Sequence, residues 1–130
     1  GGLVSSLDDY LSFAQMLLDG GVSSKTGQRV LGRRTVELFG SNRLPACSLN
    51  GEVDCGELGR REDLPLPGRS NTNQGPGVGF GLGVAVVNDS SKTRRISSNG
   101  EFYWVGAAST TFWVCAVAQS CHNYAHNYHA

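Results

Sequence analysis

Apolar side chains recur at helical spacing in the first part of the chain. They share one face of the predicted helix, and polar side chains share the other. Hydroxyls at Ser5 and Ser6 and carboxylates at Asp8 and Asp9 suit the first turn of a helix, and the pair Gly20–Gly21 suits its end. We therefore predict an amphipathic helix of about three turns, with a core-facing side made of Leu7, Tyr10, Leu11, Ala14, Leu17 and Leu18.

A second, weaker helix is predicted from Arg33 to Phe39, with Leu31, Val36 and Phe39 facing inward. The segment from Pro45 to Gly77 then contains all four prolines and no sustained period, which is typical of a long irregular loop. A loop longer than about 15 residues in a compact domain is usually functional or disordered.

The pattern changes to period two after this loop. From Gly77 to Val84 glycine alternates with apolar residues, which predicts a strand. One face of this strand would carry only glycines, so another segment could pack closely over it. A turn is predicted at 88–92, a short strand at Arg94 to Ser98, and a β-rich segment at 102–114 that small residues interrupt.

Helices followed by successive short strands indicate an α+β fold, with an antiparallel sheet packed against helices. The 130 residues allow one domain at most. The net charge is zero, with 11 basic and 11 acidic side chains, so nucleic acid is not an expected partner. No apolar run reaches the roughly 20 residues that cross a bilayer, so we expect no membrane span.

The chain opens on Gly1–Gly2 rather than Met and leads straight into a helix signal, so we interpret it as a fragment of something longer. It lacks the basic flank and apolar stretch of a signal peptide. Its four cysteines are compatible with two disulfides or with free thiols, and Cys47 and Cys55, which flank a short polar loop, are the better pair.

Four blocks occur in an order that resembles a known family. They are Gly-Gly-Leu-Val-Ser-Ser-x-x-Asp-Tyr-x-x-Phe-Ala-x-Met-Leu-Leu-x-Gly-Gly, Thr-Val-Glu-Leu-Phe, Gly-Phe-Gly-Leu-Gly, and Gly-Glu-Phe-Tyr-Trp-x-Gly-Ala-Ala-Ser-Thr. From Gly1 to about Val114 the chain resembles the C-terminal part of the serine β-lactamase-related hydrolases, which include class C β-lactamases, penicillin-binding proteins and esterases. The resemblance implies a portion of the β-lactamase-like fold.

In that family a Ser-x-x-Lys serine attacks an ester or amide carbonyl, a Tyr-x-Asn motif supports proton transfer, and a third motif on a strand walls the site. The third motif is Lys-Thr-Gly in β-lactamases and commonly Trp-Gly-Gly in esterases; this chain reads Trp104-Val105-Gly106. The resemblance makes these residues and Ala107 candidates for substrate binding, with the Ala107 amide as an oxyanion donor worth about 3 kcal/mol. Val105 departs from the esterase pattern. The plainer interpretation is a buried Trp on a strand with small neighbours.

The nucleophile and base motifs do not occur in these 130 residues. No Ser precedes a Lys by three positions, and no Tyr precedes an Asn by two, so acyl transfer has no starting group and no catalytic residue is assigned. Lys25-Thr26-Gly27 spells the β-lactamase third motif but stands in a predicted polar turn, where we interpret it as a chance match.

The resemblance ends after Val114, which divides the chain into a family-like part, 1–114, and a divergent tail, 115–130. The tail carries candidate metal ligands: Cys115, Cys121, His122, His126 and His129. The alternative, which we favour, is a frayed polar terminus in which 115–119 still extends the strand; no metal or cofactor is assigned.

Together these observations predict a portion of a serine acyl hydrolase, an esterase or β-lactamase-like enzyme, that acts on a small ester or amide substrate only when joined to its catalytic half. The alternative is a non-catalytic binding or interaction module derived from the same fold.

Overall fold

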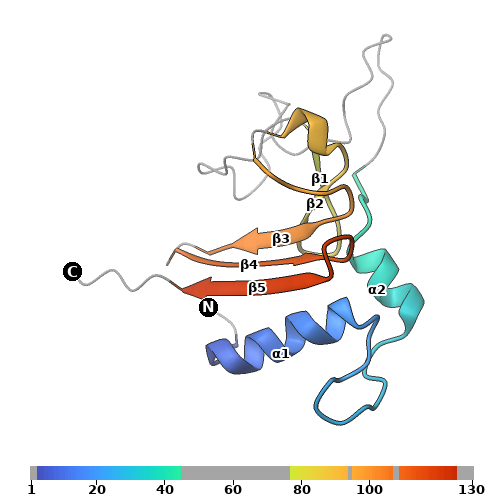
Figure 1. The fold of residues 1–130 in the computed structure, drawn as a ribbon, viewed down its shortest axis with the longest axis vertical. Helices are drawn as coiled ribbons and strands as arrows, with labels where there is room; N and C mark the ends of the chain where they lie inside the picture. The colour runs from blue at the N-terminus through green and yellow to red at the C-terminus, as the bar shows by residue number, and fades with distance from the viewer. Residues whose placement is uncertain (1–2, 45–76, 94, 107–108, 126–130) are drawn as a thin grey trace, which may run out of the picture.

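A computed structural model describes residues 3–44, 77–93, 95–106 and 109–125 (Figure 1). Within these residues, two α-helices precede a five-stranded antiparallel sheet whose strands follow one another in chain order, β1-β2-β3-β4-β5. The predicted α+β class with an antiparallel sheet is therefore confirmed. The elements are α1 (Leu7–Leu18), α2 (Arg33–Phe39), β1 (Val78–Phe80), β2 (Ala85–Val87), the 3-10 turn η1 (Ser90–Lys92), β3 (Phe102–Val105), β4 (Thr110–Cys115) and β5 (Ser120–Ala125).

Helix α1 begins and ends where its capping residues predict. Ser6 is the N-cap, and its Oγ accepts the amide of Asp9 at 3.2 Å and donates to the Asp9 carboxylate at 2.9 Å. At the other end, Gly20 and Gly21 take positive φ values of 64° and 93°, and the Gly21 amide donates to the Met16 carbonyl at 2.8 Å. The predicted bounds of this helix are confirmed.

The two halves of α1 are buried to different extents. In the second half Ala14, Met16 and Leu17 are at most 5% exposed, and they pack over β4 and β5. In the first half Leu7 and Tyr10 remain 53% and 37% exposed. The predicted core face therefore holds only for the second half, at Ala14, Leu17 and Leu18, and the prediction missed Met16. The first half borders an open pocket instead of the closed core.

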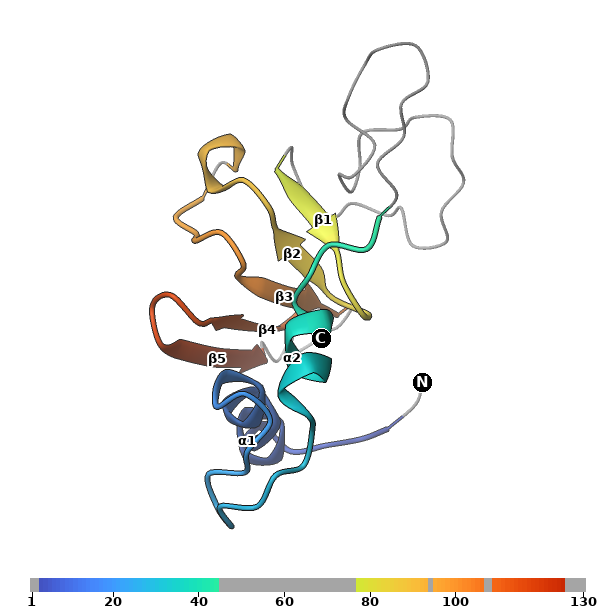
Figure 2. The same cartoon turned by 90° about the vertical axis from the view of Figure 1, so that its right-hand side faces the viewer.

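Helix α2 closes the core from the side. It lies between α1 and the β1–β2 hairpin (Figure 2). Leu31, Val36 and Phe39 pack against the core as predicted, and the Phe39 ring meets the Phe102 ring edge to face with centroids 5.5 Å apart. The bounds and the inward face of the second helix are both confirmed.

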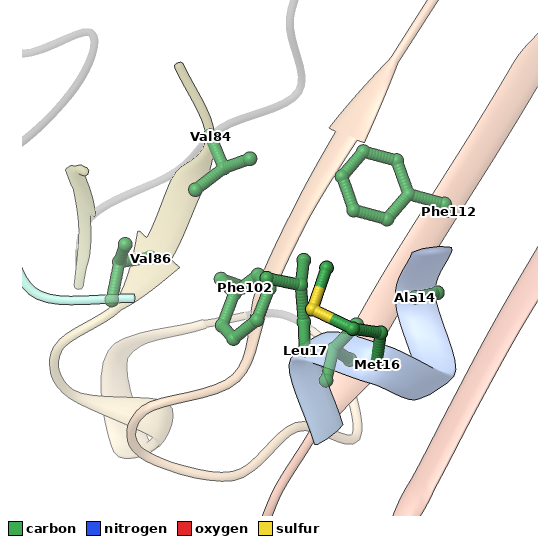
Figure 3. Close-up of a cluster of buried hydrophobic side chains, with 8 residues drawn as sticks. Ala14, Met16, Leu17, Val84, Val86, Phe102 and Phe112 are labelled. Atoms are coloured by element: carbon green, nitrogen blue, oxygen red, sulfur yellow. The ribbon is translucent and has the colours of Figure 1, made fainter. Parts of the chain in front are cut away.

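Both faces of the sheet bury apolar side chains. On the face covered by α1 and α2, side chains from α1 and from the sheet form one cluster (Figure 3): Ala14, Met16, Leu17, Val84, Val86, Phe102, Phe112 and Val114. On the other face, a second cluster contains Val78, Ala85, Val87 and Tyr103, with Trp113 packed against it, and Trp104 contacts both clusters. Alternation along β2, β3 and β4 divides the side chains between the two clusters.

The glycine-alternating segment forms a hairpin rather than one strand. A turn between Gly81 and Val84, in which the Gly81 amide donates to the Val84 carbonyl at 2.7 Å, separates β1 from β2. The predicted close packing over its glycine face is confirmed: a Cβ at Gly79 would overlap the side-chain amides of Asn42 and Asn88.

The strand expected at Arg94 to Ser98 is absent from the described part, 95–98. Arg95 turns back instead, with its guanidinium 3.9 Å above the Tyr103 ring and 3.0 Å from the Glu101 carboxylate. The Thr93 hydroxyl donates to the Arg95 carbonyl at 3.1 Å. Such local side-chain bonds compete with a strand ladder, so this prediction is wrong.

The expectation of a frayed terminus is also wrong for residues 120–125. They form β5, which pairs along its length with β4, from Cys115 opposite Ser120 to Thr110 opposite Ala125. Residues 116–119 make the turn between the two strands, so they do not extend β4. The ladder hydrogen bonds and the packing of α1 hold this polar segment in the sheet.

Gly79→Ala is expected to destabilise the protein by about 2 kcal/mol. The new Cβ would displace Asn42, whose Oδ1 accepts the amides of Phe80 at 3.0 Å and Leu44 at 3.1 Å. Urea unfolding followed by circular dichroism measures the change. Gly32→Ala is the matched control, since a Cβ there lies 3.5 Å from Thr35 Oγ1 and fits; equal losses in both variants would contradict the close packing.

Stability is expected to fall as the pH rises above about 10. Burial raises the pKa of Tyr10 and of Tyr103 above the ordinary value of 10.0. The unfolded chain therefore loses these protons first, which favours unfolding between the unfolded and folded pKa values. Urea midpoints at pH 8 and pH 10.5 should differ less in Tyr103→Phe than in the unmodified chain; an unchanged pH dependence in that variant would contradict the expectation.

Candidate functional site

An open pocket of about 600 Å³ lies where the first half of α1 faces the ends of β3, β4 and β5. Most of its surface is apolar, from aromatic and aliphatic side chains: Leu3, Leu7, Tyr10, Phe13, Trp104, Val105 and Phe112. Polar groups and one glycine complete it: Ser5, Ser6, Asp9, Gly106, Thr110, Thr111 and Asn123. An apolar pocket with a few polar groups is typical of sites for small organic ligands.

Tyr10 is the link between the helix and the sheet side of the pocket. Its ring meets Phe112 of β4 at 5.1 Å and Phe13 of α1 at 5.8 Å, both edge to face. Burial raises the pKa of the Tyr10 hydroxyl, so this group is a neutral donor and acceptor at pH 7. The three rings form an aromatic surface that continues from α1 to β4.

Trp104 forms the wall on the sheet side. It lies opposite Phe112 in the β3–β4 register, and its ring meets Phe80 edge to face at 5.3 Å. The Thr111 hydroxyl donates to the Trp104 carbonyl at 3.2 Å, which adds a side-chain bond to the ladder. Three of the four residues predicted to bind substrate, Trp104, Val105 and Gly106, therefore line one pocket; Ala107 lies outside the described residues.

The small residue at 106 also has a purely structural reason. A Cβ there would overlap the Thr110 hydroxyl, and the Gly106 amide donates to the Thr110 carbonyl at 2.7 Å. That amide is already paired in the hairpin. Of the residues in this turn that the structure describes, Ser109 has a positive φ of 56°, which marks a tight connection between β3 and β4.

Asn123 joins the two ends of the described chain at the pocket. Its Nδ2 donates to the Leu7 carbonyl at 2.6 Å and so connects β5 to the first turn of α1. Sequence analysis missed this residue, since it placed Asn123 in a frayed tail. It also missed Phe13, which lies off the predicted core face but three residues after Tyr10, a spacing that places both rings on one side of a helix.

The serine hydroxyls in this pocket make the local hydrogen bonds of the start of α1. Ser6 Oγ donates to Asp9 as part of the helix cap, and Ser5 Oγ donates to the Ser6 carbonyl at 3.2 Å. None of the lining residues is Lys or His. Among the described lining residues, the Ser-Lys or Ser-His pairing that activates a serine is therefore absent, and the Asp9 carboxylate serves the helix cap.

The other sequence candidates lie elsewhere. Lys25 and Thr26 occupy a turn between the bridged residues Val22 and Arg29, as the chance-match interpretation expects. Cys47 and Cys55 lie outside the described residues.

The tail ligands are not brought together in the part of the chain that the structure describes. Cys115 and Cys121 are free thiols, and the register places them on opposite faces of the sheet. His122 stacks on Trp113 with ring centroids 4.8 Å apart. No group of three metal-ligating side chains forms among the described residues, and His126 and His129 lie outside them.

Comparisons with known proteins do not identify the chain. No family model and no curated protein matches it. Within the described residues, neither helix is long and apolar enough to span a membrane.

Asn123→Ala is expected to lower the free energy of unfolding by about 1 kcal/mol and to speed amide exchange in the first turn of α1, because it removes the donor to the Leu7 carbonyl. Hydrogen exchange followed by NMR measures the effect. Ser12→Ala is the control, since that hydroxyl bonds only within α1, to the Asp8 carbonyl at 2.8 Å. Equal exchange in both variants would show that Asn123 does not hold the helix to β5.

Proposed function

We propose that this chain is the C-terminal portion of a serine acyl hydrolase of the β-lactamase-like fold, most similar to its esterase branch, and that its pocket binds the acyl or alcohol part of an ester. Joined to a part that carries Ser-x-x-Lys and Tyr-x-Asn, the pocket would form one wall of the active site. The 130-residue chain alone would contribute the wall that binds substrate but neither the serine nucleophile nor its base.

One observation carries the proposal. The strand that the resemblance identifies as the third motif, Trp104 to Gly106, lines an apolar pocket together with the segment that carries the first block of the resemblance, residues 3–13. These segments are far apart in sequence, and each was singled out by a separate block. Their meeting at one pocket supports a common role in binding substrate.

A purely structural role for Trp104 would leave no open space beside its side chain. Trp104 would be an ordinary core residue if apolar side chains filled the space beside it, but the described residues leave a volume of about 600 Å³ there. Drug-sized organic ligands occupy pockets of roughly 300–1,000 Å³. The size and lining therefore suit an aromatic or medium-length acyl ester.

The second candidate is a non-catalytic binding module. The absence of Ser-x-x-Lys and Tyr-x-Asn from these 130 residues favours it, as does the lack of Lys and His among the described lining residues. In this case the pocket would bind an ester-like or apolar ligand without turning it over.

The reading frame that encodes the chain separates the two candidates. The hydrolase proposal predicts that the frame also encodes Ser-x-x-Lys and Tyr-x-Asn upstream of Gly1. The polypeptide that includes them should react with a fluorophosphonate probe and hydrolyse nitrophenyl esters, while the 130-residue chain should do neither, because it has no activated serine. A frame without the two motifs would reject the hydrolase in favour of the binding module.

Within the longer polypeptide, Trp104→Ala should lower kcat/KM on aryl esters at least tenfold, because it removes the wall of the pocket. Trp113→Ala is the matched control, since Trp113 neighbours Trp104 in the sheet but lies on the opposite face. Equal losses in the two variants, with both folded by circular dichroism, would show that the Trp104 strand does not face the substrate.

A further inference from the structure

The charged side chains that line the pocket, among the described residues, are negative only. Of the residues described as lining it, only Asp9 is charged, and none is Lys, Arg or His. Its carboxylate accepts the Ser6 hydroxyl at 2.9 Å and is otherwise at the exposed start of α1. A ligand in the pocket therefore meets a negative group and no positive side chain from the described lining.

The helix dipole does not reverse this sign. The positive end of α1 amounts to about half an elementary charge. Asp9 lies in the first turn, lines the pocket and carries a full negative charge, which exceeds the half charge of the dipole. The mouth of the pocket next to α1 is therefore negative, and an anionic group of a ligand is repelled there.

The apolar lining adds a second preference for positive charge. Tyr10, Phe13 and Trp104 present aromatic rings in the same pocket. The faces of such rings carry negative potential and attract ammonium groups within about 6 Å. Aromatic side chains beside one carboxylate are the chemistry with which proteins recognise organic cations.

We propose that the pocket between α1 and β3 selects amphiphiles with an apolar body and a cationic head group, takes neutral ones less well, and discriminates against carboxylates. As a statement about substrates this rests on the proposed hydrolase function: the preferred substrates would be esters with an amino group in the part of the molecule that this pocket holds.

Three ligands of equal length test the order: phenylbutylamine, phenylbutanamide and phenylbutyrate. Each is titrated into the ¹⁵N-labelled 130-residue chain at pH 7 and low salt. The chain has two Trp residues, so the indole signals report the place of binding: Trp104 should shift, and Trp113, on the other face of the sheet, should not. We expect each step in the order, amine over amide over carboxylate, to be about fivefold in Kd, and smaller at high salt.

Two neighbouring variants assign the effect. Asp9→Asn keeps an acceptor for the Ser6 hydroxyl and should reduce the difference between amine and carboxylate at least threefold. Asp8→Asn removes the same charge from the same turn, but Asp8 does not line the pocket, so most of the difference should remain. Backbone amide spectra of both variants verify that α1 is intact.

The outcomes separate this proposal from the hydrolase proposal, because binding requires no nucleophile. Equal affinities for the three ligands, equal effects of the two variants, or no shift of Trp104 with any ligand would overturn the charge selection. An upstream frame without catalytic motifs would remove the hydrolase but leave the binding order intact.

Discussion

The packing of the second half of α1 against β4 and β5 determines the rest of the arrangement. Ala14 is fully buried, and its small side chain allows the helix to approach the sheet closely. Phe112 and Val114 of β4 form the opposing surface. With this contact in place, α2 can reach Phe102 through Phe39, and the first half of α1 projects past the closed core.

The pocket is the consequence of that projection. The same helix is fully packed at Leu17 and half exposed at Leu7, so its apolar face continues beyond the surface that the described strands cover. Exposed apolar area of this kind usually marks a binding surface. The aromatic contacts of Tyr10 with Phe13 and Phe112 keep this surface ordered although it is open.

The two helices could be predicted because local signals define them, whereas the glycine-rich segment was predicted as one strand and is divided by the turn between Gly81 and Val84. Caps at Ser6 and at Gly20–Gly21 gave the bounds of α1, and the apolar spacing gave the inward face of α2. β5 could not be predicted, because His122 and Asn123 show no apolar alternation and only the pairing with β4 makes this segment a strand. The prediction for 95–98 was wrong for the opposite reason. The sequence there is typical of a strand, but Arg95 contacts Tyr103 and Glu101 instead.

The pocket could not be predicted from local signals either. Phe13 and Asn123 come to lie beside Trp104 only through tertiary packing.

The hydrogen bond from Asn123 to the Leu7 carbonyl connects residues at nearly opposite ends of the described chain. During synthesis α1 emerges long before β4 and β5, the strands against which it packs. Until they follow, the apolar side chains Ala14, Met16 and Leu17 have no partner surface, and an isolated helix of 12 residues is marginal in water. Contacts of such long sequence separation also slow folding. While the residues between α1 and β4 are being made, the nascent chain therefore exposes the apolar face of this helix, and exposed apolar surface of this kind favours aggregation.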